Sequence, residues 1–557
     1  MRKNNRKTGK LRIIPLGGLG EIGKNMTVLE YEGEIIIIDA GLMFPEQDML
    51  GIDMVIPDIS YLLENKEKIK AIFITHAHED HVGALPYILP QLNVPLYCTK
   101  LAKGLISGKL KERKALAGAE LNVITFGEQI NLGKFRVEFF PVCHSIPDAA
   151  GLIIQTPIGT LVHTGDFKLD HTPVTGPKTD LSRLAQVGSQ GVLLLFSDST
   201  YAELPGYTLS EQVVGEALEN IIAHAEGRVI VTTFASLVTR VQQIIDAAVK
   251  HNRKVFIIGR SMTDTVKISL ELGYLKAPNG VLAKIEEMHK LPKEKVVIIA
   301  TGSQGEPTSG LVRISNHDHR QVSIIKGDTV IYSASPIPGN ESLVNRTVDN
   351  LFKQGAKVYY GRMAQTHVHG HASQEELKLM LNLVKPRFFI PVHGEFRHLA
   401  SHAKLAESVG IPQERIFTLE DGDILDLTTL GGKKAGKVES GNVYVDGLSV
   451  GDVGGIVLRN RRMLSRDGIV VIVIAVRKQD DKLAGRPDIV TRGFIDINEY
   501  KDMLETSKDI VTKIMNHEGE FSTEIGFPDS RIRAELNKYY FDQTKRRPMI
   551  LPVMVKV

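Results

Sequence analysis

Short apolar runs separated by turn residues fill the first two hundred positions, a pattern typical of β-strands joined by tight connections. Segments such as Tyr31-Glu32-Gly33 and Pro157-Ile158-Gly159 mark the turns. Helical spacing of apolar residues predicts helices over 84–91 and 102–116. The predicted strands cover residues 11–16, 26–31, 34–39, 71–75, 135–140, 151–156 and 160–164.

From about residue 209 the pattern changes to alternating helix and strand. Ser210 is placed to cap a helix over 211–224, and strand 228–232, helix 237–250 and strand 254–258 follow it. Such alternation is typical of a parallel, doubly wound sheet.

Short strands return around 357–430, with a helix over 374–384 between them. This return suggests that the first domain is interrupted by an insertion. We expect a first domain at 1–208 and 361–430, an inserted domain at 209–360, a linker at 431–449 and a C-terminal domain at 450–557. In the last region we expect glycine-rich strands over 441–455, an apolar strand over 468–476 and a helix over 497–515.

Composition narrows the class of protein. A chain of 557 residues with 43% hydrophobic and 24% charged residues is ordinary for a soluble multidomain protein. No apolar stretch is long enough for a membrane helix, the basic N-terminus lacks the apolar core of a signal peptide, and two cysteines are too few for a disulfide framework. We therefore expect a cytoplasmic protein with no membrane partner.

The net charge of +3 excludes a global basic field of the kind that announces many nucleic-acid binders. Any positive surface for a polyanion must therefore be local. The candidate segments are 1–12, 100–114, 459–462 and 545–547, although charge runs more often form a solvated surface.

One motif has two interpretations. The run Gly18-Leu19-Gly20-Glu21-Ile22-Gly23 fits the dinucleotide fingerprint G-x-G-x-x-G, which requires a helix to begin at the glycines. The residues that follow, 26–31 and 34–39, are instead typical of a β-hairpin. A tight turn at a strand end explains these glycines better than a cofactor site does.

The strongest chemical signal is the nonapeptide Thr75-His76-Ala77-His78-Glu79-Asp80-His81-Val82-Gly83, directly after the apolar run 71–74. A turn at a strand end lets three imidazoles and a carboxylate converge on one point. Imidazole together with carboxylate suits Zn²⁺ and its first-row neighbours. A polar loop with scattered histidines is the alternative, but the spacing H-x-H-x-D-H seldom arises by accident.

Three further candidate ligands, His144, Asp166 and His393, each stand after a predicted strand and beside glycine or serine. One sheet edge could gather them with the 76–81 loop. Two ions sharing a bridging carboxylate would use the whole set, and such a pair, roughly 3.5–4 Å apart, hydrolyses phosphoesters. The candidate ligands are His76, His78, Asp80, His81, His144, Asp166 and His393.

H-x-H-x-D-H with a later His, Asp and His resembles the metallo-β-lactamase fold, an αββα sandwich with metals at its sheet edge. The segments 196–200, 234–236 and 366–371 resemble the β-CASP nucleases, and 16–25, 302–307 and 544–550 resemble bacterial ribonuclease J. The resemblance runs from about residue 11 to the C-terminus. It implies an α/β chain with a metallo-β-lactamase sandwich, an inserted doubly wound β-CASP domain and a small C-terminal α+β domain.

The resemblance also implies roles for the ligands. One ion would be held by His76, His78, His144 and Asp166, and the other by Asp80, His81, Asp166 and His393. Two Zn²⁺ per chain are expected, with Mn²⁺ or Mg²⁺ as alternatives in activity. A hydroxide activated by the two metals would attack the RNA phosphorus in line.

The same resemblance implies that four residues have roles other than, or in addition to, binding metal. Asp80 and Asp198 would orient the attacking water or transfer protons, and His371 would stabilise the reacting phosphate or protonate the leaving oxygen. Asp39 would fix a ligand imidazole. Without the resemblance, Asp198 is simply a strand-end cap and His371 a buried histidine bonded to backbone.

Substrate contacts are implied for two segments, whose residues are Phe234, Ala235, Ser236, His367, Val368, His369, Gly370 and His371. The glycine- and serine-rich loops 302–305 and 333–339 follow apolar strands and could offer backbone N–H groups to a 5′-phosphate; as plain structure they are turns. Many relatives have Ser where this chain has His369.

Together with the metal-ligand pattern, the resemblance to ribonuclease J implies a two-metal ribonuclease with 5′→3′ exonuclease and endonuclease activity in mRNA decay and rRNA maturation. We expect RNA as substrate, a homo-oligomer (dimer or tetramer) assembled through residues 450–557 or a hetero-oligomer with a paralogous subunit, and contacts with other RNA-decay proteins. Two alternatives stay open: a hydrolase of small thioesters or lactams, and a non-catalytic subunit that scaffolds an active partner.

Overall fold

The computed structural model describes residues 9–46, 48–337, 339–361, 364–480, 482–517 and 527–557. The chain forms two compact units, one of residues 1–44 and 54–443 and one of residues 45–53 and 444–557. Most of the basic N-terminal segment lies outside the described residues. Within the described part, no helix has the length and apolar character that crossing a membrane requires.

The first layer of the larger unit is an eight-stranded sheet in the order β23-β22-β1-β3-β4-β6-β7-β8. Strand pairing is antiparallel from β23 to β4 and parallel from β4 to β8. Its strands are β1 Leu11–Gly17, β3 Met26–Tyr31, β4 Glu34–Ile38, β6 Ile69–Phe73, β7 Leu96–Cys98, β8 Leu121–Val123, β22 Asp423–Leu427 and β23 Gly432–Lys437.

A six-stranded sheet in the order β20-β13-β12-β11-β10-β9 forms the second layer. Phe73 of the first sheet packs against Phe139 of the second with ring centroids 6.0 Å apart, so the core lies between the two sheets. Burial of this apolar interface is the main favourable contribution to the sandwich. The strands are β9 Gln129–Leu132, β10 Phe135–Pro141, β11 Ala150–Thr156, β12 Gly159–His163, β13 Val192–Asp198 and β20 Pro386–Val392.

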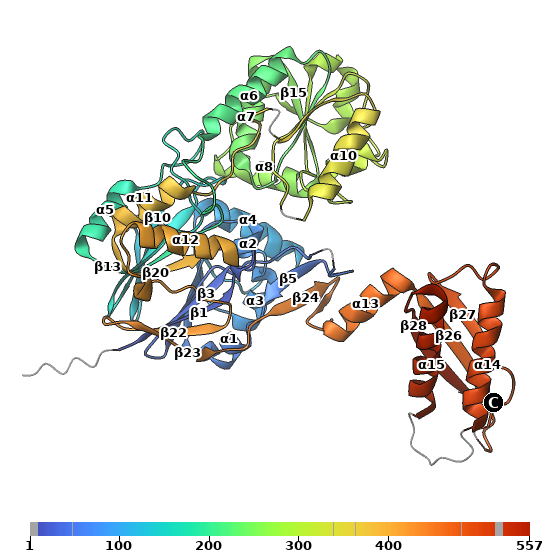
Figure 1. Cartoon of the computed structure of the whole chain (residues 1–557). Helices are drawn as coiled ribbons and strands as arrows, with labels where there is room; N and C mark the ends of the chain where they lie inside the picture. The colour runs from blue at the N-terminus through green and yellow to red at the C-terminus, as the bar shows by residue number, and fades with distance from the viewer. Residues whose placement is uncertain (1–8, 47, 338, 362–363, 481, 518–526) are drawn as a thin grey trace, which may run out of the picture. The chain divides into compact units, whose positions relative to one another are not determined.

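Helices flank the sandwich, which gives the predicted αββα architecture (Figure 1). Helix α11 packs on α5 and on β13, and α12 packs on β20, so these three cover the second sheet. The helices are α1 Ser60–Glu64, α2 Glu79–Val82, α3 Leu85–Leu92, α4 Lys100–Glu112, α5 Leu181–Gln190, α11 Gln374–Val384 and α12 Phe396–Ser408.

The inserted segment builds its own sheet, β16-β15-β17-β14-β18-β19, in which every pair is parallel. This is the expected doubly wound domain, with its helices around the sheet (Figure 1). As predicted, the Ser210 side chain caps α6 by accepting from Gln212 N–H. The elements are α6 Glu211–His224, β14 Val229–Thr232, α7 Val238–Lys250, β15 Lys254–Ile258, α8 Arg260–Leu272, β16 Leu282–Ala283, β17 Val296–Ala300, α9 Gly310–Ser315, β18 Thr329–Tyr332, α10 Glu341–Lys353 and β19 Lys357–Tyr359.

A buried carboxylate joins the inserted domain to the sandwich. Asp148 accepts from the Thr99 hydroxyl at 2.9 Å, from Leu101 N–H at 2.9 Å and from the Tyr274 hydroxyl at 2.6 Å. Tyr274 follows α8, which packs on α4. The loop that carries Asp148 also carries His144, so one segment contacts both the inserted domain and the candidate metal ligands.

The smaller unit is a three-stranded sheet with three helices, an α+β arrangement. Alternate residues of its central strand are buried, so one sheet face packs on the unit's core. The opposite face carries half-exposed apolar residues such as Val471 and Leu551, which are aligned across β26 and β28. The elements are β25 Ser449–Val450, α13 Gly455–Asp467, β26 Ile469–Val476, β27 Asp488–Arg492, α14 Lys501–His517, α15 Phe527–Thr544 and β28 Met549–Lys556.

Several elements differ from the sequence-based expectation. Strands β3 and β4 form the expected hairpin, which leaves no helix after the glycine motif and rules out the dinucleotide fingerprint. Residues 431–449, expected as a linker, contain β23 and β24 Asn442–Asp446. The pattern did not predict α13, α15 or β28.

Candidate active site

The histidine loop lies at the end of β6, as expected, but its second half is helical. After Phe73 the chain turns, and the one-turn helix α2 begins at Glu79 with His78 at its N-cap. Helix α2 turns His81 inward to 2% exposure, which the plain turn predicted from the sequence did not include. Residues from a turn and from one helical turn therefore converge on one point.

Two groups of ligand atoms meet at this sheet edge. The first contains His76, His78, His144 and Asp166, the second contains Asp80, His81, Asp166 and His393, and within each group the atoms lie within 4.8 Å of one another. All seven candidate ligands therefore come together, and Asp166 belongs to both groups. Its Oδ2 lies 3.6 Å from His76 Nε2, 3.2 Å from His81 Nε2, 3.8 Å from His144 Nε2 and 3.3 Å from His393 Nε2.

Hydrogen bonds fix the orientation of two ligand rings. His81 Nδ1 lies 2.8 Å from Asp39 Oδ2, an acceptor, so Nδ1 carries the proton. The Thr75 hydroxyl donates to the same carboxylate at 2.8 Å and therefore accepts from His76 Nδ1 at 3.1 Å. Both rings thus direct Nε2, the atom that would bind a metal ion, at the centre of the cluster.

The same logic applies to His144, whose Nδ1 donates to the carbonyl of Gly370 at 2.7 Å. Its Nε2 lies 3.1 Å from His78 Nδ1, so two ring nitrogens face each other. Converging lone pairs beside a carboxylate are a donor set for a divalent cation with nitrogen and oxygen ligands. The residues therefore fit the metal ions that the sequence implies. His393 Nδ1 is the exception among the described ligands, because it is buried without a hydrogen-bond partner.

Three of the five candidate ligand rings are neutral, and two are protonated. Burial lowers the pKa of His76 and His144 well below the ordinary value and that of His78 to about 4, so these rings are neutral. For His81 and His393 burial lowers the pKa, but the Asp166 carboxylate outweighs it and raises the pKa of His81 well above its ordinary value and that of His393 to about 9, so a metal ion would have to displace a proton from each of these rings. For Asp166, burial raises the pKa, but His393 and the other nearby imidazoles outweigh it and hold the pKa well below the usual range. The shared group is therefore a carboxylate.

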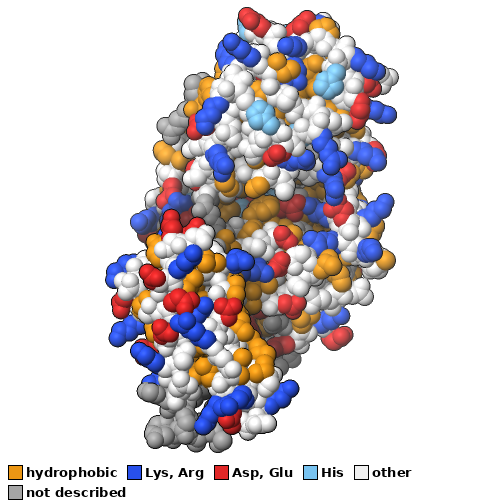
Figure 2. Space-filling view, turned by 90° about the vertical axis from the view of Figure 1, so that its right-hand side faces the viewer, with side chains coloured by type: hydrophobic (Ala, Val, Ile, Leu, Met, Phe, Trp, Pro, Cys, Tyr) orange, Lys and Arg blue, Asp and Glu red, His pale blue; other side chains and the backbone are white. Residues whose placement is uncertain are grey.

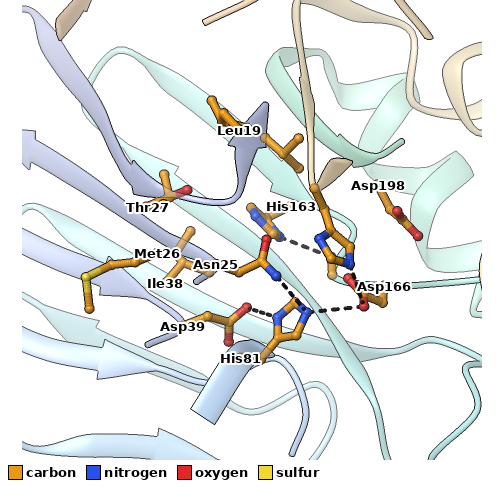
Figure 3. A pocket seen from close by; sticks show the side chains of 14 residues that line it. Leu19, Asn25, Met26, Thr27, Ile38, Asp39, His81, His163, Asp166 and Asp198 are labelled. Carbon is orange, nitrogen blue, oxygen red and sulfur yellow. Dashed lines mark hydrogen bonds and ion pairs between the residues drawn. The ribbon is translucent and has the colours of Figure 1, made fainter. Parts of the chain in front are cut away.

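A small cavity of about 20 Å³ lies behind the second ligand group, lined by residues that include Leu19, Asn25, His81 and His393. Figure 3 shows His81 between Asp39 on one side and Asp166 on the other. Asp39 and His393 have φ values of 63° and 57°, in the left-handed region that non-glycine residues seldom adopt. Such strain is concentrated at functional sites.

Asp198 and His371 meet at the same centre from different segments. Asp198 ends β13, and its Oδ2 accepts from His371 Nδ1 at 2.7 Å. Burial lowers the pKa of His371, but the Asp198 carboxylate outweighs it and raises the pKa overall. Because Asp198 binds Nδ1, the Nε2–H of His371 is left to interact elsewhere. Asp198 and His371 also form, with Asp166 and His393, a third group of side chains that could hold a metal ion.

Residues 366–371 lie against the candidate ligand His144 and are held in place by hydrogen bonds. A Cβ added at Gly370 would lie 2.7 Å from His144 Cε1, so only glycine lets the carbonyl approach the ring. The fully buried Arg240 donates to the carbonyl of Thr366 at 2.7 Å and to Glu211 at 2.6 Å. Sequence reasoning missed Arg240, because a lone arginine in a helix gives no motif.

His369 stacks on Tyr201, with ring centroids 3.8 Å apart and an angle of 6° between the planes. Its Nδ1 lies 2.9 Å from the carbonyl of His371. Burial, and then the neighbouring His371, lower the pKa of His369 to about 4, and burial and Arg240 lower that of His367 to about 3. Tyr201 was not predicted; its position three residues after Asp198 was the available signal.

The other predicted substrate segments lie apart from the ligands. Phe234, Ala235 and Ser236 form the partly exposed turn between β14 and α7, and among the described residues no hydrogen bond or ring contact joins them to the ligand groups. The loops after β17 and β18 are joined by Gln304, which donates to the Ser335 carbonyl at 2.9 Å and accepts from Ile337 N–H at 2.7 Å. Pro338 lies outside the described residues.

Surface charge agrees with the small net charge. On the face drawn in Figure 2, Lys and Arg side chains alternate with Asp and Glu rather than forming one basic field. Some residues of the predicted basic runs contact other side chains of the same chain. Arg462 forms an ion pair with Asp48 at 2.7 Å, and Arg547 lies 4.5 Å from the centre of the Phe541 ring. The basic runs alone therefore identify no RNA surface.

A carboxyl pair close to the cavity predicts a pH effect on stability. Leu19 N–H donates to Asp421 at 3.1 Å, and burial together with Glu21 raises the pKa of Asp421 from 3.8 to about 8. The folded state therefore holds a proton that the unfolded state loses, so this contribution to stability is present at low pH and declines between about pH 4 and 8.

We expect Asp421→Asn to remove that decline, so that the variant gains stability over the unmodified protein as the pH rises from 5 to 9. Thermal unfolding of both proteins across this range measures the difference. The exposed Asp246→Asn serves as the control. Parallel stability profiles for Asp421→Asn and the unmodified protein would contradict the assignment.

Four family models match the chain. They are the metallo-beta-lactamase superfamily (residues 19–203), the ribonuclease J beta-CASP domain (226–351), the Zn-dependent metallo-hydrolase RNA specificity domain (357–417) and the ribonuclease J C-terminal domain (456–557). Together they cover both parts of the sandwich, the insertion and the C-terminal unit.

Full-length relatives agree. The chain is 43% identical to ribonuclease J2 of Bacillus subtilis over 100% of both chains. It is 46% identical to ribonuclease J of Thermus thermophilus, covering 98% of this chain and 95% of that one. A solved Enterococcus faecalis structure titled as a protein of unknown function shares the fold, with a TM-score of 0.54 and 18% identity over 75% of this chain and 100% of that one.

Proposed function

The chain belongs to the ribonuclease J family and is a metal-dependent ribonuclease that acts on RNA, and from this premise we propose which of its side chains do the work. We propose an enzyme with both 5′→3′ exonuclease and endonuclease activity, serving mRNA decay and rRNA maturation in the cytoplasm. The observation that carries the assignment is the sharing of Asp166 by two ligand groups beside the Asp198–His371 pair.

Each chain would bind two Zn²⁺ ions, with Mn²⁺ or Mg²⁺ able to replace them. His76, His78 and His144 would hold one, Asp80, His81 and His393 the other, and Asp166 both. When bound, such ions lower the pKa of water and neutralise the charge of the phosphate. Asp39 would keep His81 in the tautomer that binds metal, as the Gly370 carbonyl would for His144.

The proton transfers would fall to three side chains. Asp80 and Asp198 would hold and orient the attacking water, Asp80 while also serving as a ligand. His371, with Nδ1 bound to Asp198, would present Nε2–H to the phosphate and protonate the leaving 3′-oxygen. The raised pKa of His371 supports this role, since a general acid must carry its proton.

RNA would be held by the 234–236 turn and by the 367–371 segment. The second segment lies beside the proposed metal ligands. The loops at 302–305 and 333–339 would receive a 5′-terminal phosphate, and this contact would give the exonuclease its direction. Their support is the bond network of Gln304, which fixes one loop against the other.

Assembly would involve the C-terminal unit. The apolar face of β26 and β28, with Leu551 at 41% and Val553 at 37% exposure, supports burial against a second copy or a paralogous subunit. A dimer or tetramer is proposed on that ground. Other RNA-decay proteins are proposed as further partners.

A time course on one RNA with 5′-triphosphate, 5′-monophosphate or 5′-hydroxyl ends tests the proposal. We expect the monophosphate form to be degraded from its 5′ end to mononucleotides, while internal cuts appear with all three ends. The purified protein should contain about two metal ions per chain.

Three outcomes would contradict this assignment. Equal exonuclease rates on RNAs with the three different 5′ ends would rule out the proposed contact with a 5′-terminal phosphate. Cleavage of a thioester in preference to RNA would favour the small-substrate alternative. Less than one bound ion per chain would favour a non-catalytic subunit.

A further inference from the structure

The Tyr201–His369 stack fixes one edge of the His369 ring. The two rings are almost parallel, and the Nδ1 edge of His369 faces the carbonyl of His371 at 2.9 Å. A carbonyl oxygen only accepts hydrogen bonds, so Nδ1 carries the ring proton. In the neutral ring Nε2 is then a lone pair with no hydrogen to donate.

The stack also places the His369 ring close to the proposed reacting groups. Tyr201 lies 5.8 Å from the His371 ring as well, and Gly370, between the two histidines, binds His144. His369 is only partly buried, and its Nδ1 edge is occupied by the carbonyl of His371, which leaves the Nε2 edge for a substrate contact.

A lone pair cannot bind a phosphate oxygen, which is itself an acceptor. RNA offers hydrogen-bond donors in two places, the exocyclic amino or ring N–H groups of bases and the 2′-hydroxyl of every ribose. Base donors change with the sequence, whereas an exonuclease that advances along an RNA meets a 2′-hydroxyl at each step. DNA has no such group.

We propose that His369 is a specificity-determining residue that accepts a hydrogen bond from the ribose 2′-hydroxyl next to the scissile phosphate. This inference rests on the proposed function, because it places the reacting phosphate at the ligand groups beside His371. It gives the 367–371 segment two different tasks: His371 donates to phosphate, and His369 identifies the sugar as ribose.

The test pairs a protein variant with a substrate variant. His369→Phe keeps a ring on Tyr201 but removes both ring nitrogens, and a 2′-fluoro nucleotide keeps an RNA-like sugar but removes the hydroxyl donor. The substrates are one 5′-monophosphorylated RNA with a 3′ label and a series that carries a single 2′-fluoro group at successive positions. Rates are compared as kcat/KM for each bond.

With the unmodified enzyme, we expect the 2′-fluoro group to slow one cleavage step by about tenfold, the scale of one lost hydrogen bond. In His369→Phe the all-RNA rate should fall by a similar factor, and the 2′-fluoro group should then have no further effect, since both changes remove the same bond. His369→Phe also loses the hydrogen bond from Nδ1 to the His371 carbonyl, but this loss affects the all-RNA and the 2′-fluoro substrates equally and does not change their ratio. The Thr208 hydroxyl still donates to the His371 carbonyl at 2.8 Å.

The exposed His224→Phe is the matched control and should keep the full 2′-fluoro effect, while His369→Gln, which retains an acceptor, should restore part of it. The proposal is overturned if no position is sensitive in the unmodified enzyme, if His369→Phe keeps the effect, or if the effect follows the base. A failure of the unmodified enzyme to cleave the all-RNA substrate would instead contradict the proposed function.

Discussion

Asp166→Asn is expected to abolish RNA cleavage, with a loss in kcat on the order of 10⁴-fold or more, because both proposed metal positions share this carboxylate. The amide keeps the shape of the side chain but removes the negative charge that faces five imidazoles within 4.0 Å. Both ions should be lost together. Metal analysis of the purified variant and a single-turnover assay on labelled RNA measure the two effects.

His76→Ala is the matched variant, since His76 belongs to the first ligand group only. We expect it to inactivate the enzyme while keeping part of the bound metal, and RNA binding should remain in both variants. Near-normal turnover in either variant, or complete metal retention in Asp166→Asn, would show that the ligand assignment is wrong.

His371→Ala should reduce kcat by about 10²–10⁴-fold, the range for removal of a general acid, while metal content and RNA affinity stay close to those of the unmodified protein. The reason is that His371 faces the centre but is bonded through Nδ1 to Asp198, not to the shared carboxylate. Added imidazole should restore part of the rate, because a free ring can occupy the space and deliver a proton.

A fall in bound metal would identify His371 as a ligand, an outcome that its place in the third atom group makes testable. The absence of rescue together with intact metal would point to a binding role instead of proton transfer. Asp198→Asn separates these cases, since it should mimic His371→Ala only if the pair acts as a unit.

The sequence predicted best where one short segment carries the chemistry. The spacing at 76–81 and the residues after β10, β12 and β20 were sufficient to name candidate ligands that the structure brings together, because strand ends at one sheet edge converge. Periodicity also gave α6 and α11 at their observed bounds, since each has a separate apolar face and a clear cap.

Contacts between segments far apart in the chain could not be predicted from the sequence. Tyr201 contacts the 366–371 segment because the chain returns from the insertion beside the end of β13, and Arg240 reaches the same segment from α7 of the insertion; neither residue sits in a motif. In α15 the buried Ile532, Leu536 and Tyr540 do follow helical spacing, which was the signal that could have predicted that helix.

The order of the ligands along the chain has a consequence for synthesis. His76 to Asp166 emerge from the ribosome early, but His393 follows β20, a strand that pairs with β13 only after the whole insertion has been made. The carbonyl of Gly370, which orients His144, is also added late. On the proposed ligand set, a growing chain therefore cannot cut the messenger RNA that encodes it until nearly four hundred residues have been translated.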